Sequence, residues 1–375
     1  MRKRLAETFH PGVFLEEELE ARGWTRSDLG NILGRAANDI SLIITGKRGI
    51  TPETAIGLGD AFNTGPEYWM NLETAYQLSL AEYKRGDVSL KAALYKKFPV
   101  REMLNRGWIE SSGDVNLLVN RFCEFFEVPS LDSPVLFYHA ALKSTAYGEE
   151  TPVQAAWLFR ARQLARQSML TQSFSPVKLK TCKAKLRLLM NEVEEIRKVP
   201  DILAEAGIRF VIVEFLPSGK MDGATFWLDD NSPVIAMSLL KDRIDNFWFV
   251  LMHEVSHVEH GEGKKEPIID TDLFSEHTEA NRPESEIRAD IDAVSFCVSQ
   301  DALDNFIIRT DPYYHQQKVA AFAFTNKIHP GLVVGQLQKR GRVRWNQHRR
   351  FLEKIRHIIS EPTVTDGYGF NPIIK

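Results

Sequence analysis

Residues 243–260 read RIDNFWFVLMHEVSHVEH, and this stretch decides the fold of the C-terminal half of the chain. Its length and apolar content predict a helix, with residues 246–252 as a buried turn directly before His253-Glu254-Val255-Ser256-His257. Residues four apart lie on one face of a helix, so both imidazoles can reach one cation. Glu254 lies about 100° round the helix, where its carboxylate can take a proton from a water activated by that cation.

A catalytic zinc ion requires a third protein ligand as well as a water. Three histidines in an HExxHxxGxxH frame are excluded, because His260 and Gly263 occupy the positions that need Gly and His. A carboxylate at the start of a following helix is the alternative, with Glu286 as the first candidate and Glu284 as the second. Asp290 lies four residues after Glu286 on the same helical face and can accept the proton of a ligand histidine's second nitrogen. The predicted Zn2+ ligands are His253, His257 and Glu286.

Hydrolysis of an amide also needs a group that stabilises the developing oxyanion. His329, within Ile328-His329-Pro330-Gly331, is the first candidate for this catalytic role. The other candidates are Tyr313, Tyr314 and His315. The cysteines lack the spacing of a second metal site and are expected to be ordinary buried thiols. They are Cys123, Cys182 and Cys297.

The residues around these motifs predict a small α+β domain over 201–375. Continuous β-branched and aromatic runs give three candidate strands, whereas 217–223 carries turn residues. The candidate strands are 208–215, 225–228 and 234–238. Residues 261–283 are acidic and rich in Gly and Pro, which predicts a loop, and helices resume at about 284. The chain is therefore expected to be mainly α with a short sheet.

Residues 1–80 predict five short helices. The first ends at Gly23 as a C-cap, and Thr25 caps the second. Residues 36–44 form the third. Prolines at the first helical position open the last two helices. These are Pro52 and Pro66.

Length and composition bound the possible functions. The chain has 375 residues, 43% hydrophobic and 26% charged, which indicates two or three globular domains. Three scattered cysteines indicate a reducing compartment, and no apolar run approaches the ~20 residues of a membrane span. We therefore expect a cytoplasmic protein without a membrane partner. The net charge of −3 divides into −3 over 1–80, +6 over the mostly helical 81–200 and −6 over 201–375, so the chain as a whole is not a basic, polyanion-binding protein.

The pattern His253-Glu254-xx-His257 followed by Glu286-xx-Ala289-Asp290 resembles the ImmA/IrrE family of zinc metallo-endopeptidases. Residues 221–228 and 242–249 upstream and 328–335 downstream are also similar to that family, so the resemblance covers about 200–345. It implies a zincin-like peptidase domain over 201–375, with an HExxH active-site helix, a bound Zn2+ and Glu254 as the catalytic acid–base group.

The first 80 residues resemble the HigA-type helix-turn-helix of the Xre class. The resemblance lies in residues 10–12, 46–55 and 66–72. It implies a DNA-binding domain over 1–80, in which 36–44 is the recognition helix that enters the major groove of double-stranded operator DNA, and a homodimer. The implied DNA contacts are made by Arg35, Asn38, Ser41, Lys47 and Arg48, of which Lys47 and Arg48 lie on phosphates.

Two functions follow from these resemblances. The first is a DNA-binding regulator that joins its helix-turn-helix, through a helical middle region at 81–200, to a zinc endopeptidase that cleaves a repressor or antitoxin partner. The second is an antitoxin-like repressor of a toxin–antitoxin or phage-defence operon, whose peptidase fold is a sensor or scaffold without proteolysis. The expected partners are operator DNA and a protein, either a substrate or a cognate repressor or toxin.

Overall fold

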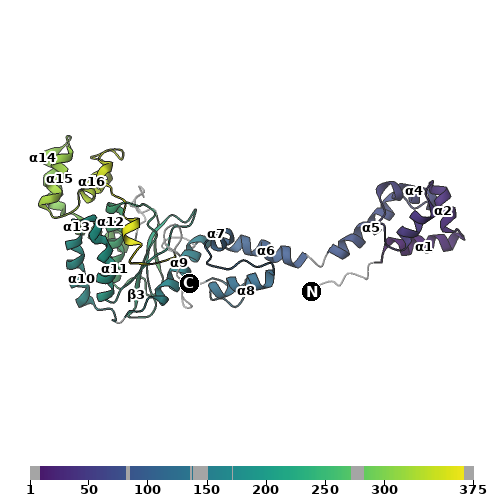
Figure 1. Ribbon diagram of the computed structural model, residues 1–375, viewed down its shortest axis with the longest axis horizontal. Helices are drawn as coiled ribbons and strands as arrows, with labels where there is room; N and C mark the ends of the chain where they lie inside the picture. Colours follow the sequence, from purple (N-terminus) through teal and green to yellow (C-terminus); the bar gives the residue numbers. More distant parts are fainter. Residues whose placement is uncertain are drawn as a thin grey trace. The chain divides into compact units, whose positions relative to one another are not determined.

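The computed structural model describes residues 9–81, 85–135, 137, 151–170, 172–271 and 283–366 (Figure 1). The chain divides into two compact units, Met1–Ala93 and Leu94–Lys375. The described part is mainly helical with one small mixed sheet, as the sequence predicts. Part of the predicted loop at 261–283, namely 272–282, lies outside the described residues.

The first unit contains the five short helices that the sequence predicts. They are α1 (Pro11–Arg22), α2 (Arg26–Leu33), α3 (Ala37–Ile44), α4 (Pro52–Phe62) and α5 (Pro66–Ala81). Gly23 ends α1 in the left-handed conformation, and Thr25 forms a capping box with Asp28 at the start of α2. Gly34 has a φ of 65° and makes the turn between α2 and α3. The two helices that follow the first thus form the helix-turn-helix pair.

An apolar core holds these helices together. Its fully buried members come from all five helices. They include Leu15, Leu29, Ile40, Ile43, Leu58 and Trp69. Gly59 in α4 is required by packing, because a Cβ there would lie 2.7 Å from the backbone nitrogen of Pro66. The close approach of α4 and the start of α5 thus explains a glycine in the middle of a helix.

Helix α6 (Arg85–Lys97) spans the boundary between the units, and the remaining elements belong to the second unit. The longer helices of the second unit are α7 (Val100–Asn105), α8 (Val115–Phe125), α9 (Pro152–Gln167), α10 (Pro176–Leu189), α11 (Val199–Glu205), α12 (Ile244–Glu259), α13 (Glu284–Cys297), α14 (Gln300–Thr310), α15 (Gln316–Thr325) and α16 (Pro330–Lys339). Shorter turns are η2 (Val193–Lys198), η4 (Arg349–Phe351) and α17 (Arg356–Ile359).

The sheet of the second unit has five strands in the order β4-β2-β3-β1-β5. They are β1 (Arg209–Ile212), β2 (Met221–Trp227), β3 (Pro233–Met237), β4 (Ile268–Thr271) and β5 (Val364–Thr365). β1 is parallel to β3 and β5, whereas β2 is antiparallel to β3 and β4. The described edge strand beside β2 is therefore β4.

Both faces of the sheet are buried, since alternate residues of each strand enter two different apolar clusters. Phe210 and Ile212 pack with α10 to α13, whereas Val211 and Val213 pack with α7 to α9. The predicted middle region at 81–200 is therefore no separate body. From Leu94 onward it belongs to the second unit, because α7 to α9 supply the core on one face of the sheet and α10 packs on the other.

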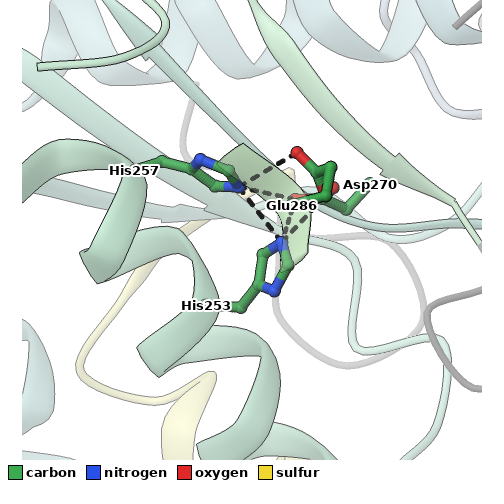
Figure 2. A group of neighbouring side chains, drawn as sticks. All are labelled: His253, His257, Asp270 and Glu286. Atoms are coloured by element: carbon green, nitrogen blue, oxygen red, sulfur yellow. Dashed lines mark hydrogen bonds and ion pairs between the residues drawn. The ribbon is translucent and has the colours of Figure 1, made fainter. Parts of the chain in front are cut away.

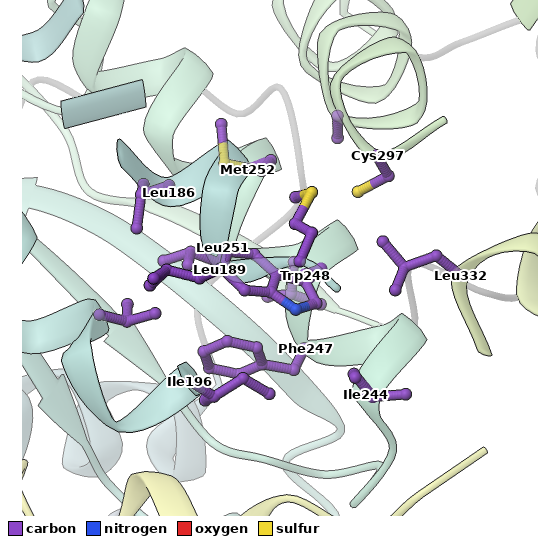
Figure 3. Close-up of a cluster of buried hydrophobic side chains, with 14 of the residues drawn as sticks. Leu186, Leu189, Ile196, Ile244, Phe247, Trp248, Leu251, Met252, Cys297 and Leu332 are labelled. Carbon is purple, nitrogen blue, oxygen red and sulfur yellow. The ribbon is translucent and has the colours of Figure 1, made fainter. Parts of the chain in front are cut away.

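Helix α12 lies on the other face and is firmly packed (Figure 3). Phe247 and Trp248 are wholly buried among side chains of α10, α13 and α16. Loss of a buried side chain of this size typically costs about 3–5 kcal/mol, so the position of α12 is strongly determined. The predicted helix over 243–260 is confirmed.

The strand predictions differ from the structure in two places. The predicted turn at 217–223 ends early, because β2 already begins at Met221 and pairs with β3 and β4. The predicted loop at 261–283 contains β4, whose pairing partner lies more than 40 residues earlier in the chain. Both errors arise because pairing between distant segments overrides local turn composition. In the described residues we find no helix that is long and apolar enough to span a membrane.

Candidate functional site

Two histidines of α12 and one glutamate of α13 converge on a single point in the second unit (Figure 2). The Nε2 atoms of His253 and His257 are 3.1 Å apart. Oε2 of Glu286 lies 3.2 Å from the first Nε2, and its Oε1 lies 3.4 Å from the second. All three side chains are buried, whereas Glu284 is exposed at the start of α13. The structure thus brings together the three residues that the sequence predicts as ligands.

A fourth donor, Asp270 of β4, is absent from the sequence-based prediction. Asp270 pairs with Gly223 of β2, so both residues face α12 from the sheet. Its Oδ2 lies 3.4 Å from His253 Nε2 and 4.0 Å from His257 Nε2. One ligand atom from each of the four side chains lies within 4.8 Å of the others. The two isoleucines before Asp270 are typical of a strand. However, the position of Asp270 in the site depends on the pairing of β4 with β2, which the sequence does not reveal.

Each histidine also contacts a carboxylate through its other ring nitrogen. Asp290 Oδ1 lies 3.0 Å from Nδ1 of His253, as predicted for this residue. Glu262 Oε2 lies 2.7 Å from Nδ1 of His257 and is itself paired with Arg288. Such contacts fix the ring orientation and direct the Nε2 lone pairs towards a common centre. Glu262 is a second contributor that the sequence prediction missed.

The arrangement of these donors fits a zinc ion. Zinc–nitrogen and zinc–oxygen distances of about 2.0–2.1 Å in a tetrahedral site place the ligand atoms about 3.3 Å apart. The distances among His253, His257 and Glu286 lie between 3.1 and 3.4 Å. Imidazole nitrogens and carboxylate oxygens are also ligand types that zinc accepts. The residues present therefore match the size and chemistry of the predicted site.

The electrostatics of the cluster also favour a positive charge at its centre. Burial alone would lower the pKa of His253, but the carboxylates around it, Asp270 above all, raise it well above its ordinary range. The two histidines have the converse effect on Asp270. Burial opposes ionisation of its carboxyl group, but the positive charge of His253 and His257 lowers its pKa. Surroundings that favour a proton at this point favour a metal dication for the same reason.

Glu254 is wholly buried between α12 and β2. Thr225 Oγ1 donates a 2.6 Å hydrogen bond to its Oε2, and a Cβ at Gly223 would lie 2.2 Å from its Oε1. The absence of a side chain at Gly223 therefore leaves room for the carboxylate. Burial, together with the neighbouring Asp270, raises the pKa of Glu254 well above its ordinary range. A carboxyl group with a raised pKa is suited to accepting and returning a proton.

The prediction that His329 stabilises an oxyanion is wrong for this structure. His329 is the N-cap of α16, where Nδ1 accepts a hydrogen bond from the Gly331 backbone nitrogen and Nε2 lies 3.1 Å from Glu353. A Cβ at Gly331 would lie 2.7 Å from Ile244, the first residue of α12. Nine residues separate Ile244 from His253, which is about 13 Å along a helix. The motif at 328–331 therefore serves helix capping and not the metal cluster.

The other candidates of the sequence analysis also lie outside the cluster. Tyr313 is exposed, the hydroxyl of Tyr314 donates to Asp311, and His315 occupies the N-cap position of α15 without a capping hydrogen bond from its side chain. All three cysteines are free, and burial raises the pKa of two of them to about 12, which makes them inert thiols. These two are Cys182 and Cys297, whereas Cys123 is half-buried.

The predicted DNA contacts lie on and beside α3 in the first unit. Asn38 and Lys47 are exposed, whereas Arg35 and Ser41 are partly buried. The Ser41 hydroxyl donates to the Ala37 carbonyl of its own helix at 3.1 Å. These four residues are therefore not equally free to reach a groove.

Arg48 is engaged within its own unit. Its guanidinium lies 2.5 Å from Asp39 Oδ1 of α3, and both side chains are substantially exposed. This pair neutralises one of the two cations that the sequence assigns to phosphate contacts. Asp39 thus competes with DNA for Arg48, and Lys47 keeps an exposed charge.

Known proteins resemble the N-terminal fifth of the chain. An uncharacterized HTH-type transcriptional regulator of Escherichia coli (strain K12), YddM, is 33% identical over 86 residues, which are 23% of this chain and 90% of that protein. Another uncharacterized HTH-type transcriptional regulator, from Haemophilus influenzae, is 40% identical over 90 residues, 23% of this chain and 84% of its own length.

One solved structure with a similar sequence is that of an addiction module antidote protein of the HigA family from Coxiella burnetii. It is 36% identical and covers 22% of this chain and 89% of its own, with a TM-score of 0.21. No protein-family model matches the chain.

Proposed function

Because this chain belongs, through its N-terminal region, to the HTH-type transcriptional regulators, we propose that it joins an operator-binding unit to a zinc-dependent peptidase. The likeness of the N-terminal region to DNA-binding regulators and antitoxins agrees with the prediction from its sequence. The peptidase proposal rests on one observation in the second unit: His253, His257 and Glu286 converge beside a buried Glu254.

For the first unit we propose that α3 enters the major groove of operator DNA. Asn38, exposed in the first turn of α3, can read an adenine through its amide. Lys47, just after α3, can neutralise a phosphate. A homodimer that binds two half-sites remains our prediction for this unit.

Two substitutions are expected to weaken operator binding in different ways. Asn38→Ala should raise the Kd for the specific duplex by about 10- to 100-fold, because a lost base contact costs about 1–3 kcal/mol. Lys47→Ala should weaken binding to all sequences and reduce the dependence of log K on log salt by about one. Fluorescence anisotropy with a duplex selected from a random library by the wild-type protein measures both effects.

Asp39→Ala is the matched variant, and it is expected to change DNA affinity in the opposite direction. It removes a carboxylate from the DNA-facing helix and frees Arg48, so it should tighten binding at low salt. If Asn38→Ala and Lys47→Ala both bind the selected duplex as the wild type does, α3 is not the reading helix.

For the second unit we propose hydrolysis of a peptide bond in a protein substrate, a repressor or antitoxin partner. His253, His257 and Glu286 would hold the zinc ion. When bound, the ion would act as a Lewis acid and lower the pKa of a water molecule. Asp290 and Glu262 keep the two imidazoles oriented. Glu254 accepts the proton of the attacking water and returns it to the leaving amine, and Thr225 holds its carboxylate in place.

The direct test is incubation of the full chain with a peptide library derived from a bacterial proteome. New peptide termini, identified by mass spectrometry, are expected with the zinc-loaded protein and not with the metal-free protein. If the zinc-loaded protein produces none on this library or on a co-expressed repressor, the peptidase proposal fails.

One observation favours the second candidate, an antitoxin-like repressor whose C-terminal unit does not cleave proteins. A catalytic zinc keeps one position open for water, whereas four protein donors converge here. On this alternative, operator binding is unaffected by substitution of Glu254, and the zinc-loaded protein yields no new termini.

A further inference from the structure

The position of Asp270 carries an inference that rests on the proposed zinc site. β4 is an edge strand of the described sheet, and it pairs with the part of β2 that holds Gly223 and Thr225, both beside Glu254 of α12. An irregularity in the register between Met221 and Gly223 adjusts this pairing and sets Asp270 opposite Gly223. Asp270 is 2% exposed and faces α12.

Asp270 shares a hydrogen bond with Glu254, but its contacts with the two histidines are those of a ligand. Its Oδ2 approaches the Nε2 atoms of both histidines, which are the atoms that Glu286 also approaches. Orientation of His253 does not require Asp270, because Asp290 already contacts the Nδ1 atom of that ring. A carboxylate on the Nε2 side therefore has a different role from Asp290 and Glu262, which contact the Nδ1 atoms and orient the rings.

The cost of burying Asp270 also points to a cation. Glu254, Asp270 and Glu286 are three buried carboxyl groups around two histidines. Burial of like charges without compensation costs several kcal/mol for each ion. A dication at the common centre offsets this cost, and it does so best when Asp270 and Glu286 each contribute an oxygen.

We propose that Asp270 is a fourth protein ligand of the zinc ion and that it closes the coordination position that a catalytic centre keeps for water. Zinc sites with four protein ligands are closed and stable, whereas catalytic sites have three and a water. The resting protein is therefore slow, and the cleavage expected of the zinc-loaded wild type comes from the fraction of molecules in which this position is open. Hydrolysis requires Asp270 to leave the metal.

Release of Asp270 needs only a local change. β4 has four residues and, in the described part of the sheet, pairs on one side only, with β2. A short edge strand is among the elements that separate from a fold at low free-energy cost. The enzyme can then open without unfolding α12, which carries the histidines.

The test uses the full chain loaded with Co2+, whose visible spectrum reports coordination, and azide as a small external ligand. In the wild type, azide is expected to leave the spectrum unchanged, because no position is free. Asp270→Ala should show a saturable spectral shift with azide and bind the metal at least about tenfold more weakly. Asp229→Ala, at an exposed residue in the turn after β2, is the control and should behave as the wild type.

Asp270→Asn covers the case in which the alanine variant folds poorly, since it keeps the side-chain shape and removes the charge. It should also admit azide. If the wild type takes up azide as readily as both variants, and metal affinities agree within twofold, Asp270 is not a ligand although the zinc site stands. If the wild type binds no Co2+, the proposed zinc site itself fails, and this inference falls with it.

Discussion

Glu254→Gln is expected to lower kcat/KM for peptide cleavage by about 10²- to 10⁴-fold, the usual contribution of a positioned general base. The amide can still accept the hydrogen bond from Thr225, but it cannot take a proton from water. The metal content should not change, because Glu254 is not one of the four converging donors. Cleavage of a library-derived peptide by zinc-loaded wild type and variant measures the effect.

The stability of this variant separates a chemical role from a structural one. Glu254 is wholly buried and carries a raised pKa, so a neutral amide in its place removes an unfavourable charge. The thermal midpoint should therefore be unchanged or higher, as is common where an active-site residue is costly to the fold. Glu259→Gln, on the exposed end of α12, is the control. Equal cleavage by Glu254→Gln and wild type would remove Glu254 from the mechanism.

Removal of the metal is expected to destabilise the second unit strongly. A ligand present at 1,000 times its Kd stabilises the folded state by about 4 kcal/mol. For a unit of this size, that corresponds to a fall in Tm on the order of 10 °C when the metal is chelated. Calorimetry of the full chain with zinc and with EDTA measures the shift.

The double variant His253→Ala/His257→Ala provides the comparison for this prediction. It should show the same Tm with zinc and with EDTA, because two of the four donors are absent. A transition of the first unit, where it is resolved, should not respond to either addition, since the donors all lie in the second unit. A wild-type Tm that does not respond to EDTA would show that the cluster holds no metal.

The sequence was sufficient for those parts of the site that follow from helix geometry. His253 and His257 lie one turn apart in α12, and Glu286 and Asp290 lie one turn apart in α13, so each pair had to share a face. The strong apolar pattern in residues 246–252 also predicted that α12 is buried in the core, and the structure agrees. Helix α3 and the turn at Gly34 were predictable for the same local reasons.

The parts that the sequence did not reveal depend on contacts between distant segments. Asp270 enters the site through pairing of β4 with β2, and Glu262 through the chain reversal after α12. His329 was assigned to catalysis because its type fits that role, but its place in the fold makes it the cap of α16. The middle helices were taken as separate because no local pattern shows that they cover the sheet.

The central claim is that His253, His257, Glu286 and Asp270 form a zinc site in a chain that begins with a DNA-binding unit. The zinc content of the full chain after equilibrium dialysis, measured by mass spectrometry with the metal-free buffer as reference, tests it most directly. We predict one zinc ion per chain for the wild type and none for His253→Ala/His257→Ala. A wild type that retains no more zinc than the double variant would contradict the account.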